Sequence, residues 1–109
     1  MSNYKDRKKP RSIVRFAAFI EGRDTHSDCM VVDFSVTGAR IHIEETDNLP
    51  QKFTLNIYIL SDMPPLAIKA RRVWRNRDLA GIHYDKLSRR NYSVIDSIVK
   101  IHRGELKQP

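Results

Sequence analysis

Two groups of residues in this 109-residue chain have the types and spacing to bind an anionic ligand through hydrogen bonds. Near the N-terminus, Arg7 and Arg11 are separated by three residues, and each guanidinium can hold a phosphate or a base edge with two parallel hydrogen bonds. Further along, Asp33, Ser35 and Gly38 form the pattern D-x-S-x-x-G. The carboxylate accepts N–H donors, the hydroxyl both donates and accepts, and glycine lets another group approach the backbone closely.

Each group also has a purely structural interpretation. Asp, Ser, Thr and Gly are common in turns, so residues 33–38 taken alone are typical of a β-turn with ordinary capping bonds. Residues 1–15 contain six cations and one acid, and such a run of charge is commonly a solvated tail. We therefore predict a flexible basic arm over residues 1–11, placed to fold over the end of a sheet, and a single domain over residues 12–109.

Alternating apolar and polar residues predict the elements that must position these groups. In the fifth alternating segment the phase breaks at Arg71 and Arg72, where a β-bulge would turn Val73 inward and Trp74 outward. Ser88 is a candidate N-cap for an amphipathic helix that packs on the sheet or covers one end, with Gly104 as its stop. The fold class expected is all-β with one helix, a small six-stranded antiparallel barrel plus a C-terminal α-helix. The six strands are expected at residues 13–20, 29–34, 39–43, 53–59, 66–74 and 79–84.

Composition limits the classes of function. Lys and Arg number 20 against 13 acids, so the net charge of +7 favours an anionic partner such as nucleic acid, a membrane surface or a phosphorylated small molecule. We find no signal peptide or membrane span, and the lone Cys29 cannot form an internal disulfide, so a cytoplasmic protein is expected. We expect no enzyme, metal or cofactor, because there is no nucleophile motif and the histidines lack ligand spacing. Those histidines are His26, His42, His83 and His102, of which His42 and His83 are expected to face solvent.

An R-x-x-x-R arm, a strand and then D-x-S-x-x-G resembles the PilZ domain family. The segments 72–75 and 81–85 look like two late strands of that family, so the resemblance runs from about residue 7 to the final helix. It implies a six-stranded antiparallel barrel that binds cyclic diguanylate. Many members carry another Arg before the first motif, where this chain has Asp6, which leaves the number of bound ligand molecules open. The resemblance implies that the ligand-binding residues include Arg7, Arg11, Asp33, Ser35 and Gly38.

The chemistry of these residues matches a ligand with two phosphates and two guanines. An arginine fork binds guanine O6 and N7 or stacks on the base, and Asp33 can accept the N1–H and exocyclic amine donors. Trp74 is either a core residue or a stacking wall of the ligand site. Arg40 and Arg75 are weaker candidates, which we expect to be solvated.

We therefore expect a single-domain receptor and adaptor for cyclic diguanylate. Ligand binding would order the N-terminal arm, and a downstream protein partner would recognise the new surface. One alternative is a small basic barrel that binds single-stranded nucleic acid, but it needs exposed aromatic platforms, and the third and fourth strands offer only Tyr58. The other alternative is a PilZ-like module that binds only protein, against which the intact motifs argue.

Overall fold

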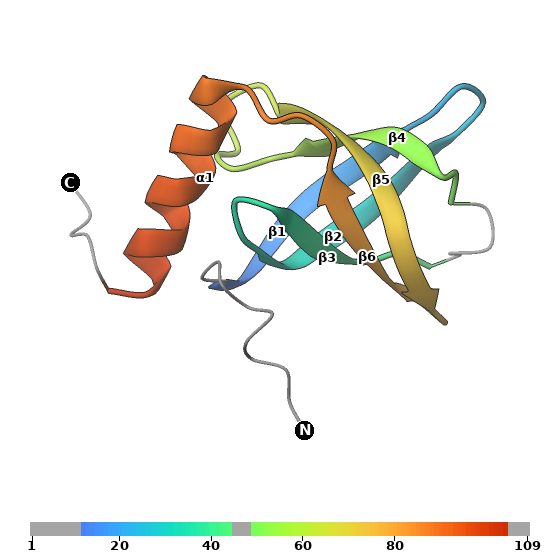
Figure 1. The fold of residues 1–109 in the computed structure, drawn as a ribbon, viewed down its shortest axis with the longest axis horizontal. Helices are drawn as coiled ribbons and strands as arrows, with labels where there is room; N and C mark the ends of the chain where they lie inside the picture. The colour runs from blue at the N-terminus through green and yellow to red at the C-terminus, as the bar shows by residue number, and fades with distance from the viewer. Residues whose placement is uncertain (1–11, 45–48, 105–109) are drawn as a thin grey trace.

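The computed structural model describes residues 12–44 and 49–104, so Arg7 and Arg11 lie outside the described residues. The strands close into one antiparallel barrel in the order β1-β2-β3-β6-β5-β4, and one helix follows them (Figure 1). This arrangement confirms the predicted fold class. The elements are β1 Ser12–Glu21, β2 His26–Phe34, β3 Gly38–His42, β4 Lys52–Ile57, β5 Leu66–Asn76, β6 Leu79–Tyr84 and α1 Arg89–His102.

The barrel interior is filled by the apolar side chains that alternate along the strands. In β4, Phe53, Leu55 and Ile57 are buried, as the period of two predicts. The buried face of β6 is made by Ala80, Ile82 and Tyr84. Because a slip of one residue would turn such a strand inside out, this alternation also fixes the strand register.

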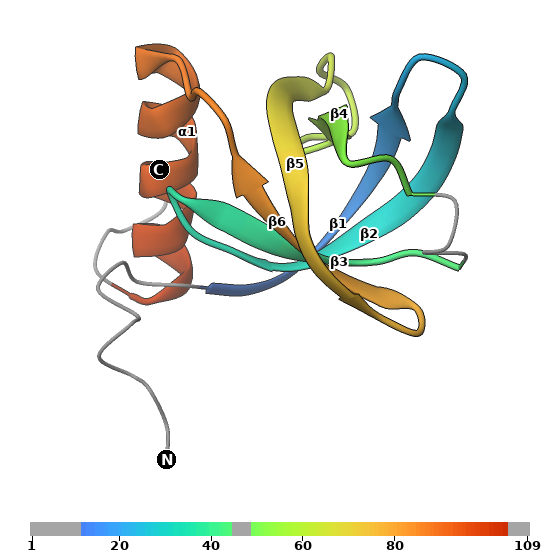
Figure 2. The same cartoon turned by 45° about the vertical axis from the view of Figure 1, so that its right-hand side comes forward.

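The helix α1 covers one end of the barrel. Ser88 is its N-cap, and the Ser88 hydroxyl accepts the Asn91 N–H at 3.0 Å, as predicted. Ile95 and Val99 are buried against the barrel, and the Ser12 hydroxyl at the start of β1 donates to the Val99 carbonyl at 3.1 Å. Figures 1 and 2 both show the turn between β2 and β3 pointing at this helix. The end of the barrel with the D-x-S-x-x-G turn is therefore the end that α1 closes.

The predicted β-bulge in β5 is present, but its facing differs from the prediction. The register of β5 on β6 shifts between Arg72 and Trp74, and Trp74 faces outward as expected. Val73 was predicted to turn inward, and this is wrong, because its side chain is 60% exposed. Arg72 is instead partly buried, since its guanidinium donates to the Leu49 carbonyl at 2.9 Å and to Gln51 Oε1 at 3.2 Å. These partners remove the cost that had argued against an inward Arg72.

Strand β2 begins at His26, three residues earlier than the alternation predicts. Residues 26–28 are polar and pair with residues 19–21 of β1 in the projecting hairpin. Ile20 of β1 belongs to the core, but its partners at residues 26–28 carry no apolar side chain, so the sequence there has no apolar period to reveal a strand.

Candidate functional site

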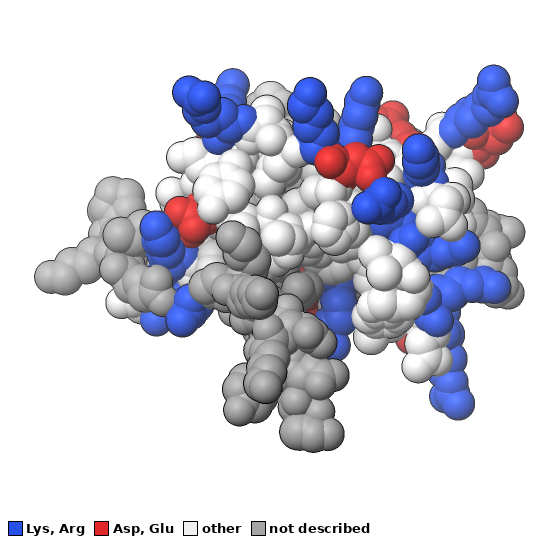
Figure 3. Space-filling model, in the orientation of Figure 1, with Lys and Arg blue, Asp and Glu red and all other residues white. Residues whose placement is uncertain are grey.

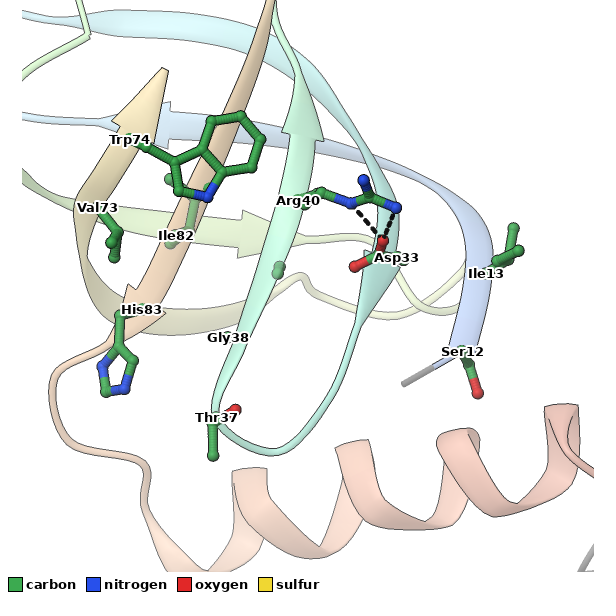
Figure 4. Close-up of a pocket in the computed structure, with 12 residues that line it drawn as sticks. Ser12, Ile13, Asp33, Thr37, Gly38, Arg40, Val73, Trp74, Ile82 and His83 are labelled. Atoms are coloured by element: carbon green, nitrogen blue, oxygen red, sulfur yellow. Dashed lines mark hydrogen bonds and ion pairs between the residues drawn. The ribbon is translucent and has the colours of Figure 1, made fainter. Parts of the chain in front are cut away.

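A hollow of about 560 Å³ opens on the barrel surface and crosses several strands. Figure 4 shows most of its side chains standing on the outer side of β2, β3, β5 and β6, above the end that α1 covers. Its wall combines a carboxylate, a guanidinium, an imidazole, an indole and exposed aliphatic groups. The lining residues are Ser12, Ile13, Asp33, Thr37, Gly38, Ala39, Arg40, Val73, Trp74, Gly81, Ile82 and His83.

Five of these residues form a single row across five neighbouring strands. Ile13 pairs with Asp33, and Asp33 pairs with Arg40 in the next strand. Arg40 pairs with Gly81, which pairs with Trp74 on its other side. Directly paired residues on adjacent strands stand about 5 Å apart, so these side chains form one continuous surface. The barrel thus brings residues from β1, β2, β3, β6 and β5 together at one level.

The Asp33 carboxylate is held beneath the Arg40 guanidinium. Both Nε and Nη2 of Arg40 donate to Asp33 Oδ2 at 2.5 Å. The Asp33 side chain is 5% exposed and that of Arg40 is 48% exposed, so the arginine covers the acid while keeping one side toward solvent. The expectation that Arg40 is merely solvated is therefore wrong. A buried carboxylate needs such a partner, because desolvation without one is costly.

Ser35 stabilises the turn that carries the motif. Its buried hydroxyl lies 3.0 Å from Thr37 Oγ1 and accepts the Thr37 N–H at 3.2 Å. The Ser35 N–H donates to the Gly38 carbonyl at 2.9 Å, which closes the link between β2 and β3. Thr37 lines the hollow, whereas Ser35 is not among the described residues that line it. The structure therefore combines the two interpretations of the motif, with Ser35 in the turn and Asp33 in the hollow.

Gly38 is required by the packing of two strands. A Cβ at this position would overlap the Ile82 carbonyl oxygen of β6, and the Ile82 carbonyl carbon and His83 Cα would lie at 3.2 and 3.3 Å. Since these are backbone atoms, they cannot move aside independently of the strand. Gly38 thus lets β3 approach β6 closely, and it also lines the hollow.

Exposed apolar groups flank the polar centre of the hollow. Trp74 is 41% exposed, which excludes the core position that the sequence left open for it. Ile13 is 86% exposed and lies at the opposite end of the row. Val73 is also exposed, and His83 faces solvent as predicted while lining the hollow. Such a mixture suits a flat, partly aromatic ligand with polar edges.

The sequence identified Asp33, Gly38 and Trp74, which the structure brings into one hollow. It missed Arg40 as a partner of Asp33. The signal was available, because a hairpin that turns through residues 35–38 pairs position 33 with position 40. Ile13 could not be found in this way, because its pairing with Asp33 depends on the register of β1 against β2.

The β5–β6 hairpin, which contributes Val73 and Trp74 to the hollow, is rich in basic residues. The segment from Leu66 to Tyr84 contains five cations and one acid. Figure 3 shows Lys and Arg gathered over the end of β5 and the hairpin that follows it, at the lower right of the view. This positive surface attracts anions toward the hollow over roughly a Debye length, about 8–10 Å at physiological salt. The cations of the segment are Lys69, Arg71, Arg72, Arg75 and Arg77.

Other chemistry has less support in the described part of the chain. A second, more open hollow is lined by Asp28, Cys29, Met30, His42 and Glu44. Burial, with a smaller contribution from the charge of Asp28, raises the pKa of the Cys29 thiol to about 12. This thiol stays protonated at neutral pH and is a poor nucleophile. Within residues 12–44 and 49–104, no three His, Cys, Asp or Glu side chains are grouped to hold a metal ion.

The same described residues contain no helix that is long and apolar enough to cross a membrane.

Solved structures with the same fold include PilZ domains of other proteins. The Bacillus subtilis inhibitor of motility MotI/DgrA matches with a TM-score of 0.77 at 8% identity, over 99% of this chain and 55% of that one. This chain thus spans about half the length of that protein. The PilZ domain of Escherichia coli YcgR, solved with c-di-GMP, matches with a TM-score of 0.69 at 12% identity, over 91% and 92% of the two chains. The PilZ domain of CeSA from a cellulose-synthesizing bacterium gives 0.61 at 14% identity, over 86% and 95%.

These low identities establish a shared fold, and the family itself is established by sequence. No curated protein matches the chain in a sequence search. The sequence model of the PilZ domain, however, matches residues 5–100, which include the arm motif, the D-x-S-x-x-G motif and most of α1. The chain therefore belongs to the PilZ domain family.

Proposed function

We propose that this protein is a receptor that binds cyclic diguanylate in the hollow around Asp33, Arg40 and Trp74. The observation that carries the proposal is the row in which a carboxylate, a guanidinium and an indole lie at one level on β2, β3 and β5. These three groups match the three recognition features of a guanine, namely its N–H donors, its acceptor edge and its flat face. PilZ domains in general bind this ligand.

Each residue then has a defined role. Asp33 accepts the N1–H and amine donors of a guanine. When the ligand binds, the Arg40 guanidinium shifts from its contact with Asp33 Oδ2 to the acceptor edge of the guanine. Trp74 supplies an apolar surface for stacking. Arg7 and Arg11, which lie outside the described residues, supply forks for phosphates and guanine O6 and N7. They precede Ser12, which lines the hollow, so the chain enters the site directly from the arm.

Ser35 and Gly38 act through the turn that they shape. The hydroxyl of Ser35 fixes the turn, and Gly38 holds β3 against β6, so both keep Asp33 at its position in the row. Because the receptor passes its signal to another protein, it acts as a cytoplasmic adaptor and does not insert into a membrane. Its bound form presents a new surface, made partly by the ordered arm, to a downstream protein partner.

The direct test is calorimetric titration with cyclic diguanylate, which reports affinity and stoichiometry together. We expect binding by the unmodified protein and much weaker binding of cyclic diadenylate, because adenine lacks the N1–H donor and the O6 acceptor. Asp33→Asn should weaken binding by about 5- to 150-fold. Asp28→Asn is the matched control, since Asp28 is an exposed carboxylate on the same strand and should leave binding unchanged. Absence of binding by the unmodified protein contradicts the proposal.

Salt dependence separates this function from binding of single-stranded nucleic acid. A dianionic ligand makes few ion contacts, so its affinity should fall only gently as salt rises. A protein that neutralises six or more phosphates loses about 10³-fold or more between 50 and 200 mM salt. Tight, strongly salt-dependent binding of single-stranded DNA or RNA, with no binding of cyclic diguanylate, would favour the nucleic-acid alternative.

A further inference from the structure

Gly81 leaves the centre of the row without a side chain. It pairs with Arg40 on one side and with Trp74 on the other, so it separates the guanidinium from the indole. A Cβ built on Gly81 would overlap Nε1 and Cε2 of Trp74 and would lie 2.8 Å from its Cδ1. These three atoms belong to the five-membered ring of the indole. That ring therefore occupies the space above β6 that a side chain at position 81 would need.

The backbone at Gly81 gives no other reason for glycine. Gly104 is the glycine with positive φ among the described residues, so Gly81 has a conformation that alanine can adopt. Glycine within a strand ordinarily weakens it, and its presence often marks the close approach of another group. Here the approaching group is the Trp74 ring, which the bulge after Arg72 directs across β6. Figure 4 shows the indole reaching from β5 toward Arg40.

We infer that Gly81 is a positioning residue, which allows Trp74 to lie against β6 and present its free face to the hollow as a stacking platform for a purine. The ring is partly exposed although it covers Gly81, so one side rests on the strand while another remains open. With a side chain at position 81 the ring has to leave this place. The part of the inference that concerns the ligand rests on the proposed function, while the positioning of Trp74 is independent of it.

Tryptophan fluorescence tests the positioning without any ligand, because Trp74 is the single tryptophan of the chain. Gly81→Ala should shift the emission to longer wavelength and increase quenching by acrylamide, since the displaced ring gains contact with water. Gly22→Ala is the control: its Cβ would meet Pro50 Cγ at 3.1 Å, and its nearest neighbours are Pro50 and Thr25. Emission and quenching unchanged by Gly81→Ala would overturn the inference.

A melting-temperature cycle separates a conflict with the ring from a need for glycine in the strand. In the unmodified background, Gly81→Ala should lower the melting temperature. In a Trp74→Ala background the obstacle is absent, so the same change should leave the melting temperature unchanged or raise it. An equal decrease in both backgrounds would show that glycine serves the backbone alone, which contradicts the inference.

Titration with cyclic diguanylate completes the cycle. Gly81→Ala and Trp74→Ala should each weaken binding by about 5- to 150-fold, the range for loss of one base–aromatic stack. The double variant should bind no more weakly than Trp74→Ala alone, because Gly81 acts through the ring. Losses that multiply in the double variant would contradict this role. If the unmodified protein does not bind the ligand, the proposed function fails, and fluorescence and melting still decide the role of Gly81.

Discussion

The burial of Asp33 makes Arg40 part of the fold as well as part of the site. A carboxylate removed from water is stable as an anion where donors replace its hydration. Arg40 provides two such donors, both on Oδ2. Because the guanidinium remains half-exposed, water can replace part of the hydrogen bonding that it gives to Asp33. A ligand can also reach the ion pair from the hollow. The pair is therefore strong enough to organise the site and open enough to rearrange.

We predict that Arg40→Ala lowers the free energy of unfolding by about 1–2 kcal/mol, less than the full cost of breaking a buried ion pair, because solvent screens the arginine. Chemical denaturation measures the loss. Arg23→Ala, which removes an exposed arginine from the turn after β1, should change the stability by less than about 0.5 kcal/mol. Equal effects of the two changes would show that Arg40 does not stabilise Asp33.

The sequence predicted the site residues whose roles follow from a short local motif. It missed the residues whose roles depend on the pairing of strands. Asp33 and Gly38 stand in a short motif whose residue types suggest their roles. Arg40 looked solvated because alternation places it outward, and outward residues usually face water. Its contact with Asp33 follows from the hairpin register, which sequence spacing can suggest. The overlap between Gly81 and Trp74 follows from a bulge in a different strand, and spacing cannot reveal it.

At the scale of elements, alternation predicts strands where one face is buried and fails elsewhere. The strand predicted at 79–84 is observed with the same bounds, and the one predicted at 53–59 is observed at 52–57, where it ends two residues early. The bulge in β5 was found because the phase breaks there, but a broken phase does not tell which residues turn outward. Here the facing depends on a hydrogen bond from the Arg72 guanidinium to the Leu49 carbonyl, which lies far away in the sequence.

A core residue of a strand and a residue of the proposed site should respond in opposite ways to substitution, one in stability and the other in ligand binding. Ile57 of β4 is fully buried, so Ile57→Ala should cost about 2–5 kcal/mol of stability through the cavity it leaves. Arg11→Ala should change stability by less than about 0.5 kcal/mol and weaken binding of cyclic diguanylate by about 5- to 150-fold. Thermal unfolding and calorimetry on both variants measure the two effects. An equal loss of melting temperature would make Arg11 structural and remove it from the proposed site.

At the scale of the whole molecule, the point at which the arm joins the barrel links the hollow to the helix. Ser12 lines the hollow, and its hydroxyl donates a hydrogen bond to the Val99 carbonyl of α1. The arm therefore joins the barrel at a residue that lies beside both the hollow and the helix. A surface made jointly by arm, ligand and helix is one that a partner protein can recognise, since none of these parts forms it alone.

The composition of the arm predicts how this surface arises. Residues 1–11 contain few apolar groups that could offset the entropy of ordering them, and Arg7, Lys8, Lys9 and Arg11 repel one another. A bound ligand adds two phosphates and two guanine edges, which reverse that repulsion. We therefore predict that binding orders the arm across the barrel end while the strands keep their positions. The ordering reduces the affinity, but it converts a small molecule into a change of protein surface.

Amide hydrogen exchange on the free and ligand-bound protein measures this change along the chain. Protection should rise at residues 5–12 and at residues 33–39, which include the turn beside the hollow. Residues 53–59 serve as the internal control, because they include most of the core strand β4, which should exchange slowly in both states. Protection of the arm before ligand is added would mean that binding does not order it. An arm that still exchanges rapidly at saturation would mean that the ligand is held by the barrel alone, and the output would then have to come from the hollow itself.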